Sequence, residues 1–308
     1  MIKIVFFATP DIALNSLDYL YKKDDIDICA VVTQPDRPSG RGNKIIFSPI
    51  KKYATEHNIK IFQPESIKKS KETIEELKSL NVDFFVTFAF GQILSQEVLD
   101  IPKFETVNLH ASLLPKYRGA NPIQRALING EKETGICTMI TELGMDCGDV
   151  CKKYPIRIDE NMNFENLHDI ISEKSPELIY ETLVGLYNKT LTAIPQNEKY
   201  VTFAPKLAKE ECLINWNKTS SEIHNLVRGI YKTPSAYFVY NGKQIKVLET
   251  KICECCNNCE CGSIICCDKE GVEIKTSNGA IKLIRVKPEG KNEINARDWY
   301  NGLKGRKE

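Results

Sequence analysis

The sequence lacks a long apolar run at its start. The segment MIKIVFFATP is too short for a membrane-spanning helix and soon reaches Pro10 and Asp11. It also has no cleavage pattern of a signal peptide, so we expect neither secretion nor membrane attachment. Charge of one sign is missing too, because the formal net charge of the 308 residues is only +1. A net charge this close to zero says little about which partners the protein binds.

A dinucleotide-binding fingerprint is also missing, since the first predicted strand-to-helix turn, ATPDIA, contains no GxGxxG. A dinucleotide cofactor is therefore disfavoured. Cysteine, by contrast, is abundant: seven of the 12 fall between Cys253 and Cys267. In a large chain without an export signal, reduced thiols of a cytoplasmic enzyme are the better interpretation than disulfides.

The segment CECCNNCEC contains CxxC spacings, from Cys253 to Cys256 and from Cys256 to Cys259. Four thiolates at such spacings can hold a structural zinc ion. A surface loop of free thiols is the competing interpretation, and we favour it. We therefore expect no metal.

The length of the chain favours two domains. In its first half, β-rich runs at 3–8, 26–34, 59–62, 82–90 and 106–112 alternate with helical patterns. One helical pattern starts with Thr9 as its N-cap and Pro10 as its first helical residue. The others lie at 48–57, 70–80 and 162–188. This alternation predicts an α/β fold with a largely parallel sheet. We expect it to occupy residues 1–189, with a linker at 190–206.

Beyond residue 207 the pattern changes to short strands and turns. Asn241-Gly242 and Asn278-Gly279 each separate two alternating runs, which is typical of β-hairpins. We therefore expect a small, mostly β barrel over 207–308. It holds 17 Lys or Arg against 13 Asp or Glu, and this mild excess permits a nucleic-acid partner without requiring one.

The segment VNLHASLLPKYRGANP places polar residues at the end of an apolar strand. Asn108 and His110 point to one face, because side chains alternate along a strand, and ligands of such sheets bind at the carboxyl ends of strands. Asp146, between Gly144 and Gly148, follows the next strand, and we expect neighbouring strand ends to bring it to His110. An Asn donor, a His and an orienting carboxylate suit acyl-type transfer. Alone, however, each is more often a structural polar group or a turn former.

The segments NLHASLLPKYRGANPIQRAL and TGICTMITELGMDCGDV together resemble the folate-dependent formyltransferases. The resemblance implies a Rossmann-like sheet, catalytic roles for Asn108, His110 and Asp146, 10-formyltetrahydrofolate as formyl donor, and no metal in the chemistry. It also implies that folate contacts come from Phe88, Phe90, Gly91, Ile93, Leu94, Ser112, Leu113, Leu114 and Pro115.

Features of the sequence other than Asn108, His110 and Asp146 resemble the branch of the family that acts on methionyl-tRNA. They are the loop TQPDRPSGRGNK, the junction FAPKLAKEECLINW and the β-rich end of the chain, which is similar to an OB-like tRNA-binding domain. The resemblance implies formylation of initiator methionyl-tRNA for translation initiation, with tRNA contacts from Arg37, Arg41, Lys44 and Lys206. With two Pro and two Gly, residues 34–44 are expected to have no regular structure and to clamp the acceptor stem. We expect a monomer.

Three alternatives stay open at this point: a formyltransferase for a different amine, a hydrolase that releases formate, and an RNA-binding module whose catalytic domain has decayed. The intact Asn108, His110 and Asp146 weigh against the last. The remaining histidines, His57, His168 and His224, have no neighbours in the sequence that suggest a site.

Overall fold

The computed structural model describes residues 1–39, 44–254 and 259–304. The density of contacts between Cα atoms divides the chain into two compact units. The first comprises Met1–Gly119, Thr134–Arg157 and His168–Phe203, and the second comprises Ala120–Glu133, Ile158–Leu167 and Ala204–Glu308. Most of the segment expected to be a linker, residues 190–203, therefore belongs to the first unit.

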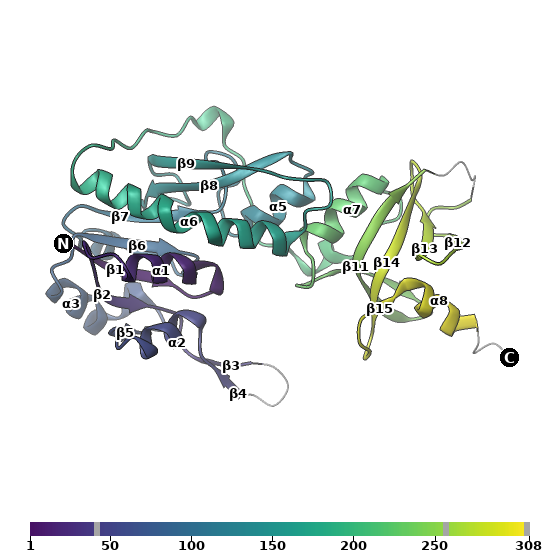
Figure 1. The fold of residues 1–308 in the computed structure, drawn as a ribbon, viewed down its shortest axis with the longest axis horizontal. Coiled ribbons are helices and arrows are strands. Elements are labelled where there is room, and N and C mark those ends of the chain that lie inside the picture. Colours follow the sequence, from purple (N-terminus) through teal and green to yellow (C-terminus); the bar gives the residue numbers. More distant parts are fainter. Residues whose placement is uncertain (40–43, 255–258, 305–308) are drawn as a thin grey trace. The chain divides into compact units, whose positions relative to one another are not determined.

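The first unit is built on a seven-stranded sheet (Figure 1). Its strands, in spatial order, are β5 (Ile61–Phe62), β2 (Ile26–Val32), β1 (Ile2–Ala8), β6 (Phe84–Phe88), β7 (Glu105–His110), β8 (Glu133–Ile140) and β9 (Val150–Arg157). The first five are parallel to their neighbours, and β8 runs antiparallel to β7. The predicted Rossmann-like, mostly parallel sheet is confirmed.

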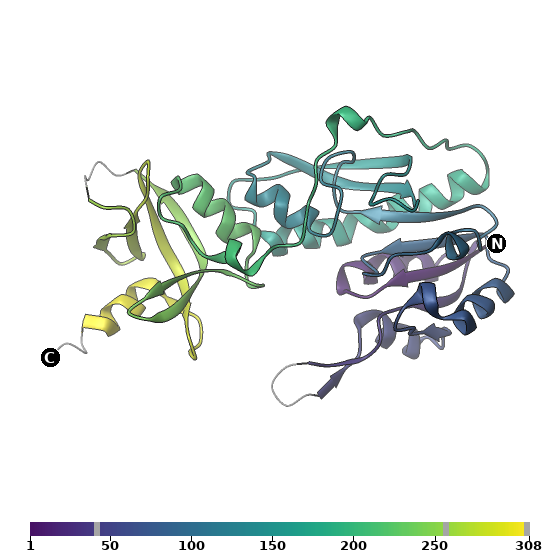
Figure 2. The same cartoon turned by 180° about the vertical axis from the view of Figure 1, so that it is seen from behind.

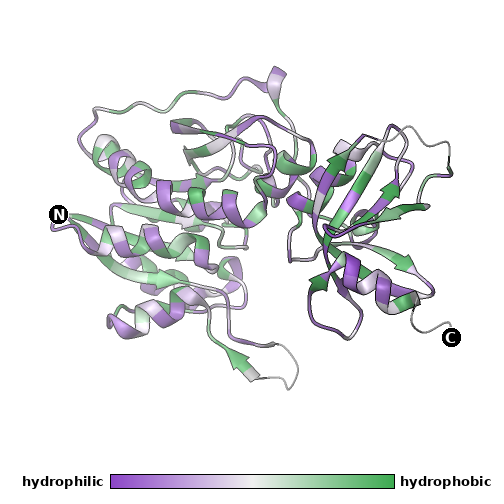
Figure 3. Ribbon diagram, turned by 45° about the vertical axis from the view of Figure 1, so that its right-hand side comes forward, coloured by the Kyte–Doolittle hydropathy of each residue, from purple (hydrophilic) through white to green (hydrophobic). Residues whose placement is uncertain are grey.

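Helices cover both faces of this sheet, which explains why its central strands are continuous apolar runs. The helices are α1 (Leu14–Tyr21), α2 (Pro49–Glu56), α3 (Lys71–Ser79), α4 (Gln96–Leu99) and α6 (Phe164–Tyr187), with a 3-10 turn before α1 and another before α3. Val5, Phe7 and Phe85 of the strands pack with Leu77 of α3 and Val98 of α4 in one buried cluster. Figure 1 shows α1 and α6 in front of the sheet, and Figure 2 shows it from behind. Hydropathy colouring gives strands that are mostly apolar and helices with one polar side (Figure 3).

The predicted N-cap at Thr9 is wrong. Thr9 Oγ1 donates instead to the carbonyl of Phe90, 3.2 Å away, and accepts the Gln34 N–H. The helical stretch begins with a 3-10 turn over Asp11–Ala13, whose N-cap residue Pro10 has no side chain that can cap. The Thr9 hydroxyl is used to join three strand ends, so it is not available to the helix.

The expectation of no regular structure in the basic loop is wrong at both of its ends. β3 (Arg37–Ser39) and β4 (Lys44–Ile46) form a two-stranded antiparallel ribbon in which Pro38 pairs with Ile45. Proline is tolerated here because a two-stranded ribbon consists only of edges. Arg41 lies outside the described residues.

The second unit carries a six-stranded antiparallel sheet, so the predicted β-rich end of the chain is confirmed. Its strands are β10 (Ala236–Tyr240), β11 (Lys243–Cys253), β12 (Ile264–Cys267), β13 (Val272–Lys275), β14 (Ala280–Pro288) and β15 (Ile294–Asn295), and its helices are α5 (Pro122–Ile128), α7 (Ser220–Gly229) and α8 (Ala296–Lys304). Both predicted hairpins form, with Asn241-Gly242 between β10 and β11 and Asn278-Gly279 between β13 and β14. Trp299 of α8 packs edge-on against Phe238 in the buried core of this sheet.

Candidate active site

The polar residues at the end of β7 lie at the carboxyl edge of the sheet, as predicted, but Asp146 arrives by a different route. Because β8 is antiparallel to β7, His110 pairs with Cys137, and the end of β8 at Ile140 lies beside Val107 near the start of β7. The argument from neighbouring strand ends was therefore wrong. The loop between β8 and β9 folds back and brings Asp146 to His110 all the same.

The imidazole of His110 is held from two sides. Its Nε2 lies 2.9 Å from the carbonyl oxygen of Tyr117, and its Nδ1 lies 3.5 Å from Oδ2 of Asp146. A carbonyl only accepts, so Nε2–H donates to it. Both ring nitrogens thus face acceptors. The side chain is 6% exposed, so little water competes.

The carboxylate of Asp146 is fixed by the backbone around it. Its Oδ2 accepts the N–H of Gly119 at 2.7 Å, and its own φ of 48° lies in the left-handed region. Gly148, two residues later, turns so tightly that an added Cβ would lie 2.0 Å from the carbonyl oxygen of Ile140. Gly148 is thus a steric requirement of the turn.

Asn108 is oriented by a neighbour on β6. Thr87 Oγ1, on the strand paired with β7, donates to Asn108 Oδ1 at 2.8 Å. Because Oδ1 of Asn108 is engaged in this way, the NH₂ group of the same side chain points away from Thr87 and stays available as a donor. Asn108 therefore presents a donor on the same face of β7 as His110.

A thiol also lies close to this cluster. Cys137 pairs in register with His110 and is completely buried. Burial raises the pKa of its thiol to about 12, so the thiol stays neutral near pH 7 and is a poor nucleophile. The cluster thus offers hydrogen-bond donors and a carboxylate rather than a covalent nucleophile.

The residues predicted to contact folate divide into buried and accessible ones. The buried group is Phe88, Phe90, Leu94, Ser112 and Leu114, and the accessible group is Gly91, Ile93, Leu113 and Pro115. Ser112 Oγ donates to the carbonyl of Lys116, which ties the loop together. Ile93 is 72% exposed. Contact with folate stays a prediction for all nine.

The residues predicted to contact tRNA lie apart from this cluster in the sequence. Arg37 is exposed on β3, where its Nη2 lies 3.3 Å from Glu65 Oε2. Lys44 begins β4, and Arg41 lies outside the described residues. Lys206 is exposed in the second unit, where its carbonyl accepts from Arg125. Their role, too, stays a prediction.

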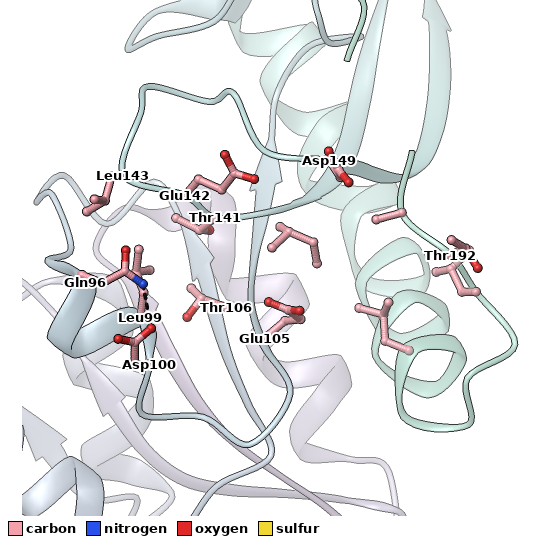
Figure 4. Close-up of a pocket in the computed structure, with 14 residues that line it drawn as sticks. Gln96, Leu99, Asp100, Glu105, Thr106, Thr141, Glu142, Leu143, Asp149 and Thr192 are labelled. Atoms are coloured by element: carbon pink, nitrogen blue, oxygen red, sulfur yellow. Dashed lines mark hydrogen bonds between the residues drawn. The ribbon is translucent and has the colours of Figure 1, made fainter. Parts of the chain in front are cut away.

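A hollow lies at the start of β7, at the opposite end of this strand from His110. It measures about 740 Å³ and includes Glu105 and Thr106, at the start of β7, in its lining. Figure 4 shows Asp100, Glu105 and Glu142 around it. Burial, then the charge of Glu142, raises the pKa of Glu105. The hollow is thus distinct from the Asn108–His110 cluster.

Within the described ranges, no group of three His, Cys, Asp or Glu side chains is arranged to hold a metal ion. Of the CECCNNCEC segment, Cys255 and Cys256 lie outside those ranges. Searched over the same residues, no helix has both the length and the apolar character needed to span a membrane.

The fold and the cluster together define a class of protein. It has an α/β domain with Asn, His and Asp side chains at the carboxyl edge of its sheet, followed by an antiparallel β domain. A family model described as formyl transferase matches residues 2–183, and one described as formyl transferase, C-terminal domain, matches residues 206–304. The chain belongs to the formyl transferase family of enzymes. The resemblance seen in the sequence motifs is confirmed.

Similar proteins are named for one particular reaction. A methionyl-tRNA formyltransferase of Clostridium perfringens is 43% identical over 97% of this chain and 96% of its own length. One of Clostridium acetobutylicum is 42% identical over 98% and 97%. Among solved structures, an N-formyltransferase from Helicobacter canadensis, in complex with folinic acid and dTDP-3-aminofucose, is similar with a TM-score of 0.67. It is 24% identical, covers 92% of this chain and 99% of its own, and so supports the fold alone.

Sequence reasoning missed the residues that hold the cluster in place. They are Thr87, Tyr117, Arg118, Gln196 and Thr202. Most of these contacts join positions 50 to 85 residues apart. Spacing along the chain carries no signal for such pairs, and Gln196 falls in the segment expected to be a linker.

Proposed function

We propose that the chain transfers the formyl group of 10-formyltetrahydrofolate to the α-amino group of methionine on initiator tRNA. The observation that carries formyl transfer is the His110 ring, held between two acceptors beside the oriented amide of Asn108. The name shared by relatives that match nearly the whole chain supports methionyl-tRNA as acceptor. The resemblance of the segments around Asn108 and Asp146 to folate-dependent formyltransferases supports a folate as donor.

In this mechanism the nucleophile belongs to the substrate. The methionyl amine attacks the formyl carbon, a C–N bond forms, and the carbonyl oxygen becomes a tetrahedral oxyanion. Asn108 donates one hydrogen bond to that oxygen. His110 donates a second from Nδ1, whose 3.5 Å contact with Asp146 is the looser of its two. Loss of one donor of this kind costs about 2.7–4 kcal/mol of barrier.

Collapse of the intermediate then breaks the bond between the formyl carbon and N10. The attacking amine loses a proton and N10 gains one, which leaves tetrahydrofolate and the N-formylated aminoacyl-tRNA. Asp146 orients the ring of His110 for this step. Proton transfer of this kind, directly or through water, contributes about 10²–10⁴-fold to the rate.

The two substrates contact different parts of the chain in this function. Residues around Ile93 and Pro115 contact the folate, and the second unit with Lys206, together with Arg37, Arg41 and Lys44 of the basic loop, contacts the tRNA. Phosphate contacts of such basic residues make binding weaker at high salt. The reaction places the protein in the cytoplasm, where initiator tRNA is used, and requires only one copy of the chain.

The acceptor amine is tested directly. The purified full chain is incubated with 10-formyltetrahydrofolate and, in separate reactions, methionyl-tRNA, free methionine, a dTDP-amino sugar and water alone. We expect efficient transfer only to methionyl-tRNA. Efficient transfer to the amino sugar, or release of formate without an acceptor, contradicts the proposal and identifies which alternative holds.

A further inference from the structure

Gln196 hydrogen-bonds two loops of the candidate active site at the same time. Its Oε1 accepts from Arg118 Nε at 3.1 Å and from Arg118 Nη2 at 2.9 Å. Its Nε2 donates to the carbonyl oxygens of Asp146, at 2.8 Å, and Gly148, at 2.7 Å. An amide offers two acceptor sites and two donors, so every one of them is used.

Arg118 lies between the two backbone groups that hold the reacting side chains. The residue before it, Tyr117, supplies the carbonyl that accepts from His110, and the residue after it, Gly119, supplies the N–H that binds Asp146. The Arg118 side chain is itself only 6% exposed, and its Nη2 also donates to Glu198 Oε1 at 2.7 Å. Fixing its guanidinium therefore fixes both neighbours.

The backbone on both sides of this contact is in an unfavourable conformation. Tyr117 has a φ of 62° and Asp146 a φ of 48°, in the left-handed region that residues other than glycine seldom occupy. Such conformations persist only where the surrounding contacts over-determine them. Thr202 adds to these contacts, since its Oγ1 accepts the N–H of Tyr117 at 2.9 Å and its carbonyl accepts that of Arg118.

We propose that Gln196, acting through Arg118 and the Asp146 backbone, is a positioning residue that sets the distance between His110 and Asp146 for catalysis. The inference rests on the proposed function for its kinetic consequence, but its structural consequence is independent of the substrate. Gln196 touches no reacting atom. It holds the Tyr117–Gly119 loop and the Asp146–Gly148 loop in one register.

The decisive variant is Gln196→Glu. A carboxylate still accepts from Arg118, but it has no donor for the carbonyls of Asp146 and Gly148, and its negative oxygen repels them. We expect the Asp146 loop to shift, kcat to fall about a hundredfold, and KM for both substrates to stay within a factor of about two, because a displacement near 1 Å has this effect on rate.

The matched control is Asn197→Asp, which makes the same amide-to-acid change one residue along. Asn197 is exposed, and its Oδ1 accepts the neighbouring Lys199 N–H at 3.1 Å. The two variants therefore have the same net charge and are changed in the same segment. Of the two replaced side chains, Gln196 is the one that contacts the loop carrying Asp146. We expect wild-type kcat in the control.

Hydrogen exchange provides a readout that needs no substrate. The Gly119 amide donates to Asp146 Oδ2 at 2.7 Å, so its exchange rate reports whether the carboxylate is in place. We expect faster exchange of this amide in Gln196→Glu at unchanged global stability, and unchanged exchange in Asn197→Asp. Should Gln196→Glu unfold, Gln196→Met, which keeps the length without polar atoms, replaces it.

Three results overturn the inference: wild-type kcat in the Gln196 variant, a loss of kcat that only follows a loss of folded protein, or a loss of kcat without faster Gly119 exchange. A further outcome has a different meaning: the wild-type protein does not transfer the formyl group, yet the Gly119 amide exchanges faster in the variant. It contradicts the proposed reaction and leaves the positioning role of Gln196 supported.

Discussion

Individual side chains at the carboxyl edge of the sheet are each held by at least one hydrogen-bond partner. Thr87 occupies the oxygen of Asn108, the carbonyl of Tyr117 occupies one nitrogen of His110, and the Gly119 amide occupies one oxygen of Asp146. Groups prepared in this way need little reorganisation when charge develops, and this is the main source of electrostatic catalysis.

The orientation of Asn108 gives a prediction at this scale. Thr87→Val removes the hydroxyl at nearly constant volume, so the Asn108 amide is free to rotate and its donor is lost for part of the time. We expect kcat to fall about tenfold, which corresponds to about 1.4 kcal/mol of barrier. Steady-state kinetics of Thr87→Val and of Thr87→Ser, which keeps the hydroxyl, measure it. Equal kcat in the two variants contradicts the assigned orientation.

The sequence indicated the three residues of the cluster but not what holds them. Asn108 and His110 stand out because polar residues in an apolar strand are unusual, and Asp146 stands out through its flanking glycines. Their partners Thr87 and Gln196 have no such signature, since a Thr in a strand and a Gln in a loop are ordinary. Only tertiary contacts distinguish them.

Elements were predictable where the periodicity was strong. The long helix expected over 162–188 is α6, Phe164–Tyr187, and both Asn-Gly hairpins formed. The antiparallel direction of β8 was not predictable, because an apolar run such as Gly135–Met139 has the same composition in either direction. The ribbon of β3 and β4 was missed for another reason, since Pro and Gly conceal pairing in so short a segment.

The α7–β11 contact in the second unit gives a prediction about pH. His224 of α7 is 8% exposed, and its ring nitrogens lie 2.9 Å from Thr250 Oγ1 and 3.2 Å from the carbonyl of Glu160. Burial is the largest of several opposing influences and lowers the pKa of His224, with the charge of Arg228 acting in the same direction. The unfolded chain therefore binds a proton more readily than the folded one.

The sign of the effect on stability follows from this difference. The stabilising contribution is fully present above the ordinary histidine pKa of about 6.5 and is lost as the pH falls below it. We expect the unfolding free energy of the full chain to fall between pH 7.5 and pH 5, and to fall less in His224→Gln. Urea unfolding at the two pH values measures this, and an equal fall in both proteins rules out His224 as a cause.

At the scale of the whole molecule, two units of different architecture are matched by two domain models of one family. The first unit carries the Asn108–His110–Asp146 cluster, and residues 207–308 hold a mild excess of basic side chains. The chain also spans almost the full length of its methionyl-tRNA formyltransferase relatives. This organisation fits a reaction that joins a small folate donor to a large nucleic-acid acceptor.

The most direct test of the account is the single-turnover rate of N-formylmethionyl-tRNA formation by wild-type protein and by His110→Ala, with both substrates saturating and folding verified by circular dichroism. We predict that His110→Ala loses about 10²–10⁴-fold in this rate. We also expect Asp146→Ala to add little to that loss, because Asp146 acts through His110. A folded His110→Ala variant with a rate near that of the wild type contradicts the account.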